Sequence, residues 1–199
     1  MADKKAVLFD LDGTLINSLP DISRSMNAAL RLHGLPEHPE RAYCYFVGDG
    51  AVNLTHRAAS GADDATLEAV YHDYRRIYAA HCNDTSHVYP GIEQMLKDLR
   101  SAGFRMAVLS NKDQSDVESV IAHYFADPPF EILRGRRPGV GIKPDPAAAL
   151  AIAADMGLTP GEFWYLGDTP TDIAACRNAG MHMIAVTWGF RPENELREA

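Results

Sequence analysis

Short hydrophobic runs and amphipathic stretches alternate along most of the chain. Residues 6–9 form an apolar run, and from residue 89 onward stretches with helical periodicity alternate with four further short apolar runs. Such alternation predicts parallel strands joined by right-handed crossovers, with helices on both faces of the sheet. The expected strands are 6–9, 104–109, 130–133, 163–166 and 183–186, and the expected helices are 92–102, 114–122, 146–156 and 171–179.

The segment between the first strand and residue 87 has helical periodicity only. Residues 19–33 carry apolar side chains at helical spacing and end before Gly34, a residue suited to a helix C-cap. Residues 47–59 and 64–81 also fit helices. The sequence therefore predicts an α/β fold in which a Rossmann-like parallel sheet core, residues 1–16 and 87–199, carries an inserted all-helical domain, residues 17–86.

Length and composition allow one catalytic domain with such an insertion. The 199 residues are 46% hydrophobic, which is enough for a full core and a small second one. The formal net charge of −8 argues against a general affinity for nucleic acid or anionic lipid. We therefore expect no nucleic-acid partner and no membrane partner. Both a monomer and a homodimer are compatible with the sequence.

The cysteines and the first residues of the chain indicate a compartment. Cys44, Cys82 and Cys176 are widely spaced and form no CxxC pair, so neither a disulfide framework nor a zinc site is predicted. The four apolar residues after Lys5 are too few for a signal peptide, and no apolar run is long enough to span a bilayer. These observations predict a reducing, cytoplasmic location.

Two carboxylates follow the first strand with one residue between them. If the strand stays regular through Asp10 and Asp12, both side chains project to the same side. Like charges this close disfavour joint ionisation, so a cation or a shared proton has to relieve the crowding. Gly13 allows a sharp turn, and the backbone amides there can face an anion. Asp10 and Asp12 are therefore candidate catalytic and metal-binding residues, and Gly13 is a candidate phosphate-binding residue.

Polar residues also follow other strands of the predicted sheet. Ser110 and Asn111 follow the second strand in chain order, Asp168 follows the fourth, and Lys143 lies in the loop after the third. Ligands of open parallel sheets bind beyond the carboxyl ends of the strands, so these residues should meet the carboxylate pair at one rim. Carboxylates, a hydroxyl, amides and a lysine suit phosphoryl transfer, because its catalysis depends on positioning and on neutralising the phosphoryl oxygens.

These residues lie in four motifs that resemble those of the haloacid dehalogenase superfamily, and within it those of the phosphoglycolate phosphatases. The motifs occur in the family's order and span nearly the whole chain. They are residues 10–15, Ser110-Asn111-Lys112, Lys143-Pro144-Asp145-Pro146 and residues 167–172. The resemblance implies an α/β core with a helical cap that excludes water and selects the substrate, here a small phosphate ester.

The resemblance also implies catalytic roles. Asp10 attacks phosphorus and forms an aspartyl phosphate, whereas Asp12 protonates the leaving oxygen and later deprotonates the hydrolytic water. Ser110 and the Asn111 amide hold phosphate oxygens, and Lys143 offsets the negative charge of the phosphate and of Asp10.

Magnesium is the cofactor that the resemblance implies. Its ligands would be the carboxylate of Asp10, the backbone carbonyl of Asp12 and the carboxylate of Asp168. Such hard oxygen ligands, with retained waters, are what Mg²⁺ prefers. Asp172 would assist indirectly, through water or an orienting hydrogen bond, and capping of the following helix is an equally good role for it.

Two residue patterns separate the activities of the superfamily. Asp12 indicates phosphate transfer, because the family's dehalogenases need no acid for a departing halide and lack an aspartate there. Phosphonatases place a Schiff-base lysine in the cap, and this chain has no lysine between Lys5 and Lys97. A phosphatase is therefore expected, with a phosphosugar mutase, a nucleotidase or a pyrophosphatase of the same superfamily as alternatives. A phosphate-accepting regulatory module is disfavoured, because its acceptor aspartate follows the third strand.

The cap is expected to choose the substrate. Residues 46–50 resemble a glycine-containing cap segment of the phosphoglycolate phosphatases. Arg24 or Arg57 is the candidate cation for a second carboxylate on the substrate. Lys112 is expected to be exposed, and the tyrosines at positions 71, 74 and 78 are expected to pack within the cap.

Overall fold

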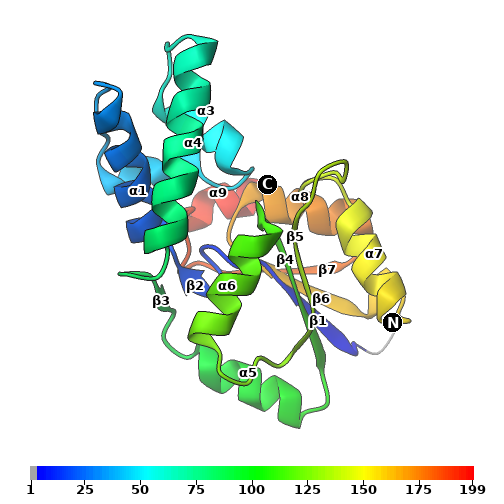
Figure 1. The fold of residues 1–199 in the computed structure, drawn as a ribbon. Helices are drawn as coiled ribbons and strands as arrows, with labels where there is room; N and C mark the ends of the chain where they lie inside the picture. The colour runs from blue at the N-terminus through cyan, green and yellow to red at the C-terminus, as the bar shows by residue number, and fades with distance from the viewer. Residues whose placement is uncertain (1–3) are drawn as a thin grey trace.

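The computed structural model describes residues 4–199 and contains a sheet of five parallel strands in the order β5-β4-β1-β6-β7 (Figure 1). In the central strand, Phe9 pairs with Val108 on one side and with Leu166 on the other. The predicted α/β fold with a Rossmann-like parallel sheet is confirmed. The strands are β1 (Ala6–Phe9), β4 (Arg105–Asp113), β5 (Phe130–Arg136), β6 (Phe163–Gly167) and β7 (His182–Ala185).

Helices cover both faces of this sheet, because successive strand side chains point to opposite faces. Ala6 and Leu8 of β1 pack on one face against α7 and α8. Val7 and Phe9 pack on the other face against α5 and α6. The helices of the core are α5 (Ile92–Ser101), α6 (Gln114–Tyr124), α7 (Ala147–Asp155), α8 (Pro170–Ala179) and the short α9 (Glu193–Glu198), with a 3-10 turn at Pro160–Glu162.

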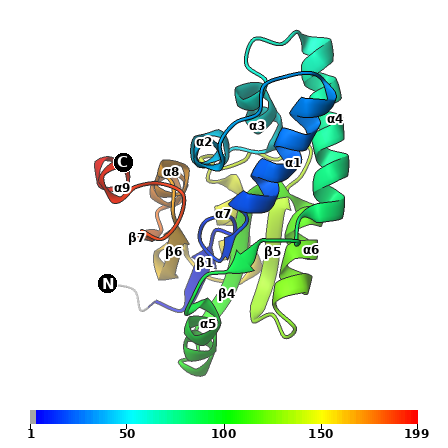
Figure 2. The same ribbon diagram turned by 90° about the vertical axis from the view of Figure 1, so that its left-hand side faces the viewer.

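Four helices form a separate group beyond one end of the sheet, which we call the cap (Figure 2). Their own hydrophobic cluster includes Met26, Leu30, Tyr43, Val70 and Tyr78. A two-stranded antiparallel ribbon of β2 (Ile16–Asn17) and β3 (His87–Val88) lies where the chain enters and leaves the cap. The division of the chain at residues 17–86 stays a prediction. The cap helices are α1 (Leu19–Leu32), α2 (Glu40–Phe46), α3 (Ala51–Ala58) and α4 (Asp64–His81).

The expected helix 47–59 is wrong at its beginning, because the structure has two helices in this region. α2 ends at Phe46, and a loop separates it from α3, which begins at Ala51. Gly48 and Gly50 in that loop have φ values of +123° and +93°, which a regular helix does not contain. No helix within residues 4–199 has both the length and the apolar character that a membrane crossing needs.

Candidate active site

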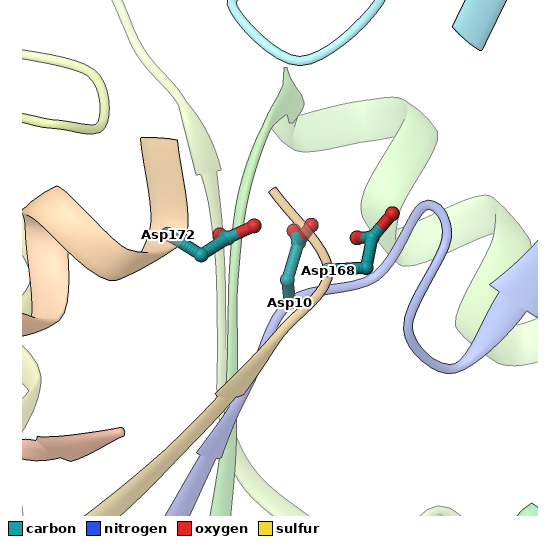
Figure 3. Close-up of side chains that lie close together, drawn as sticks. All are labelled: Asp10, Asp168 and Asp172. Carbon is teal, nitrogen blue, oxygen red and sulfur yellow. The ribbon is translucent and has the colours of Figure 1, made fainter. Parts of the chain in front are cut away.

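Three carboxylates from different parts of the chain converge at the carboxyl ends of the strands (Figure 3). Asp10 follows β1, Asp168 follows β6, and Asp172 lies in the first turn of α8. One oxygen from each lies within 4.8 Å of an oxygen of the other two, and all three residues are buried. The structure therefore brings together the three carboxylates that were predicted at the metal site, and the remaining predicted ligand is the backbone carbonyl of Asp12.

Lys143 is the cation of this cluster. Its Nζ lies 2.7 Å from Oδ1 of Asp10 and 2.7 Å from Oδ1 of Asp172, and its side chain is only 3% exposed. Although burial disfavours the charged amine, the two carboxylates hold the pKa of Lys143 well above its ordinary value. The side chain of Asn111 fixes the Lys143 backbone through two hydrogen bonds, because it accepts from the Lys143 amide at 2.8 Å and donates to the carbonyl at 3.0 Å.

Three carboxylates lie near one ammonium group, so their negative charges are not fully balanced. Burial and this imbalance raise the pKa values of two of these carboxyl groups. Burial and the charge of Asp172 raise the pKa of Asp10 well above its ordinary value, although Lys143 lowers it in part. Burial and Asp172 also raise the pKa of Asp168 to about 7. A divalent cation would relieve this repulsion, and carboxylate oxygens are the ligands that Mg²⁺ prefers. The residues present therefore fit a magnesium ion.

Asp172 already has hydrogen-bond partners at both oxygens. Oδ1 accepts from Lys143, and Oδ2 accepts from the Thr169 amide at 3.1 Å and the Thr169 hydroxyl at 2.7 Å. Thr169 is the N-cap residue of α8, and the bond from its amide is the reciprocal half of a capping box. Asp168 has different partners, since it accepts from the Thr14 hydroxyl at 3.2 Å and from the Phe190 amide at 2.7 Å. Asp172 thus orients the lysine and stabilises the first turn of its helix. Its indirect part in metal binding stays a prediction.

Asp12 lies outside the three-carboxylate cluster. Its Oδ1 accepts a hydrogen bond from the Ser18 hydroxyl at 2.5 Å, and both of its oxygens accept from Nζ of Lys112, at 2.9 and 3.1 Å. The charges that crowd Asp10 are accordingly those of Asp172 and Asp168. β1 ends at Phe9, so the regular alternation expected through Asp10 and Asp12 does not continue.

The expectation that Lys112 is exposed is wrong. Its side chain is 7% exposed, and its Nζ lies 4.7 Å from the centroid of the Tyr78 ring in the cap. Burial opposes the charge of Lys112, but Asp12 raises its pKa above the ordinary value. β4 continues through Asp113, so Lys112 lies two residues beyond Ser110 along the same strand. The pairing of β4 with β5 shifts register between Leu109 and Asp113, so regular alternation does not predict the direction of the Lys112 side chain. The expected strand 104–109 also ends before this residue, and the sequence therefore contains no indication of its burial.

A small cavity separates the cap from the strand ends. It has a volume of about 60 Å³. Ser110, which is buried, is one of the residues that line it, and its hydroxyl accepts a hydrogen bond from the Lys112 amide at 3.2 Å. The wall also includes Asp10, Asp12, Lys112 and Lys143 from the core and Tyr74, Arg75 and Tyr78 from the cap.

Neither predicted cap cation lines this cavity. Arg24 is paired with Asp21 at 2.7 Å, and Arg57 is paired with Asp49. The expectation for Arg24 and Arg57 is therefore wrong. Arg75 of α4 is the cap cation at the cavity, and the sequence does not distinguish it from the other two, because all three lie on cap helices.

Gly13 lies directly against the carboxylate cluster. Its φ is +88°, and a Cβ built on it would lie 2.2 Å from Oδ2 of Asp168. A side chain at this position would displace Asp168. The close approach also explains why the turn after β1 needs glycine.

Comparisons with known proteins agree with this geometry. A phosphoglycolate phosphatase from Haemophilus influenzae is 32% identical over 98% of this chain and 91% of its own length. One from Pasteurella multocida is 32% identical over 100% of this chain and 92% of its own. A crystal structure from Haemophilus somnus, described as a predicted phosphoglycolate phosphatase, has 30% identity and a TM-score of 0.90 over 95% of this chain and 88% of its own.

A family model also matches most of the chain. The model describes haloacid dehalogenase-like hydrolases and matches residues 7–186, a range that contains all four motifs. The predicted resemblance is thereby confirmed. On this match, and on relatives that align over nearly its full length, the chain belongs to the haloacid dehalogenase-like hydrolase family.

Proposed function

We propose that this protein is a magnesium-dependent phosphatase that hydrolyses a small phosphomonoester of the phosphoglycolate type. The observation that carries this proposal is the buried cluster of Asp10, Asp168 and Asp172 around Lys143, at the cavity between core and cap. The similarity to phosphoglycolate phosphatases over nearly the whole chain supports the substrate type.

Two chemical steps follow from the positions of Asp10 and Asp12. A carboxylate oxygen of Asp10 attacks phosphorus as the bond to the leaving oxygen breaks, and Asp12 donates a proton to that oxygen. The product is an aspartyl phosphate on Asp10. Water then attacks its phosphorus while Asp12 accepts a proton, and phosphate leaves with Asp10 restored.

The remaining residues position the phosphoryl group. The Ser110 hydroxyl and the backbone amide of Asn111 bind the phosphoryl oxygens. The expected phosphate contact of Gly13 is not part of this proposal, because the Gly13 amide already donates to the Ile16 carbonyl at 2.9 Å and Gly13 does not line the cavity. Lys143 offsets negative charge at Asp10. A magnesium ion held by Asp10, Asp168 and the Asp12 carbonyl supplies further neutralisation when bound.

Phosphate release from the purified protein tests the proposal. We expect turnover of 2-phosphoglycolate and slower turnover of p-nitrophenyl phosphate, both lost in EDTA. Asp10→Asn should reduce turnover by at least about 1,000-fold. Asp127→Asn is the matched control, because the Asp127 side chain is 86% exposed. Absence of turnover of any phosphomonoester by the wild-type protein with Mg²⁺ would overturn the proposal.

A further inference from the structure

Lys112 is a buried cation at the cavity with a single carboxylate partner. Among the described residues, three cations line the cavity, and two of them are held by two carboxylates each. Lys143 contacts Asp10 and Asp172, and Arg75 contacts Asp113 and Asp116. Of the carboxylates that the structure describes, only Asp12 lies within ion-pair distance of Lys112. Within residues 4–199, Lys112 is therefore the cavity cation with the fewest carboxylates to balance its positive charge.

The partner of Lys112 is a residue that the reaction needs. Under the proposed function, on which this inference rests, an oxygen of Asp12 has to contact the leaving oxygen of the substrate. Both oxygens of Asp12 now accept hydrogen bonds from Lys112, at 2.9 and 3.1 Å. Contact with the substrate takes one of them away and leaves the other, so the buried ammonium loses one of its two hydrogen bonds to Asp12 and part of the balance of its charge.

We propose that Lys112 binds a second anionic group on the substrate, a carboxylate carried by the leaving group, and so determines substrate specificity. The Tyr78 ring lies on one side of Nζ, 4.7 Å from it, and keeps the ammonium at the cavity. The new anion replaces the hydrogen bond that Asp12 gives up to the substrate.

The position of Lys112 also limits where the anion lies on the substrate. Asp12 marks the place of the leaving oxygen, and Nζ of Lys112 lies within 2.9 Å of Asp12. An anionic group near that oxygen can reach the ammonium inside the small cavity. Phosphoglycolate meets this requirement, since one carbon separates its carboxylate from the ester oxygen.

Comparison of two substrates tests the inference. We would measure kcat/KM for 2-phosphoglycolate and for 2-hydroxyethyl phosphate, which has a neutral hydroxymethyl group in place of the carboxylate. The wild-type protein should prefer 2-phosphoglycolate by at least about tenfold. Lys112→Met should lower the ratio of the two kcat/KM values by about 10- to 100-fold, the usual effect of a lost hydrogen bond to a charged group.

The ratio separates specificity from a general loss of activity. Lys112→Met also leaves Asp12 without its ion pair, which affects both substrates alike. Lys112→Arg keeps the positive charge and should retain most of the preference. Lys97→Met is the matched control, because Lys97 is exposed on α5, and its ratio should not change. A ratio in Lys112→Met within threefold of the wild-type value would overturn the inference.

The wild-type measurement alone can contradict the inference, so the test does not depend on whether the variant folds. If the unaltered protein hydrolyses both esters equally well, the inference fails while the proposed phosphatase activity stands. If it hydrolyses neither ester in the presence of Mg²⁺ but turns over another phosphomonoester, the inference and the phosphoglycolate-type substrate both fail, and if it turns over no phosphomonoester, the proposed function itself fails.

Discussion

The ammonium of Lys143 lies 2.7 Å from Oδ1 of Asp172, a carboxylate with no solvent-exposed surface. The same ammonium lies 2.7 Å from Asp10. One cation thus contacts both Asp172, in the first turn of α8, and Asp10, the residue that follows β1. The proposed nucleophile depends for its position on a helix far away in the sequence.

Replacing Lys143 tests how much this cation stabilises the fold. Lys143→Met leaves two buried carboxylates without their common partner, so the free energy of unfolding should fall by about 3–5 kcal/mol at neutral pH in EDTA. Urea denaturation measures the change. Lys97→Met, on the exposed side of α5, should change it by less than about 0.5 kcal/mol. A loss below about 1 kcal/mol for Lys143→Met would contradict the expectation.

Magnesium affinity should increase with pH below neutrality. Burial and Asp172 raise the pKa of Asp168 to about 7, so a proton competes with the metal at lower pH. Affinity should rise by about tenfold or more per pH unit between pH 5.5 and 7, because the raised pKa of Asp10 lets this ligand hold a proton as well. Isothermal titration in buffers of different ionisation enthalpy should show release of about one proton or more per ion near pH 6. Affinity that does not change across this range would rule out Asp168 as a ligand with this pKa.

The same pKa shift predicts a pH dependence of stability in the metal-free protein. The folded protein holds the Asp168 proton more tightly than the unfolded chain, where the ordinary value is 3.8. The contribution of Asp168 to the free energy of unfolding therefore falls as pH rises from about 4 to 7. Relative to wild type, Asp168→Asn should be more stable at pH 7.5 than at pH 4.5 in EDTA. Urea denaturation at the two pH values checks this, and a constant difference would contradict it.

Gly13→Ala separates steric displacement from backbone strain. A Cβ at Gly13 would lie 2.2 Å from an Asp168 oxygen, whereas one at Gly103 would meet nothing within 4 Å. The two glycines have similar φ values, +88° and +81°, so Gly103→Ala reports the strain alone, about 1–2 kcal/mol. Gly13→Ala should lose more stability than this and should also weaken Mg²⁺ binding. Equal losses in the two variants, with Mg²⁺ binding unchanged, would show that Asp168 tolerates the methyl group.

Arg75 is expected to attach the cap to the core. It pairs with Asp113 at 3.0 Å and with the buried Asp116, whereas the neighbouring Arg76 is 67% exposed and pairs only with Asp73 among the described residues. Arg75→Gln should lower the free energy of unfolding by about 2–4 kcal/mol, because it leaves Asp116 without its ion-pair partner. Arg76→Gln should lower it by less than about 0.5 kcal/mol. Similar values from urea denaturation of the two variants would exclude an ionic attachment through Arg75.

The sheet and most of the site were predictable from local pattern. The alternation of Ala6, Val7, Leu8 and Phe9 between two apolar faces requires a strand covered on both sides, which the structure has. The ends of parallel strands coincide in space, so residues that follow them meet at one rim. This rule predicts that Asp168 lies at the site, because the residue directly follows a strand.

The surroundings of the cations were not predictable in this way. Lys112 looked exposed because the residues that cover it come from α4, among them Tyr78, more than 30 positions earlier in the chain. Arg24, Arg57 and Arg75 all lie on cap helices, and the direction in which those helices pack decides which of them reaches the cavity.

The sequence by itself determined the parallel sheet, the family's four motifs and the residues that gather at the strand ends, because these depend on periodicity and on position along a strand. Only the tertiary structure decided that Asp10 shares Lys143 with Asp172, and that Asp12 is paired with Lys112 under the cap. The physical reason is that burial and ion pairing depend on distances between segments far apart in the chain, and no local pattern contains those distances.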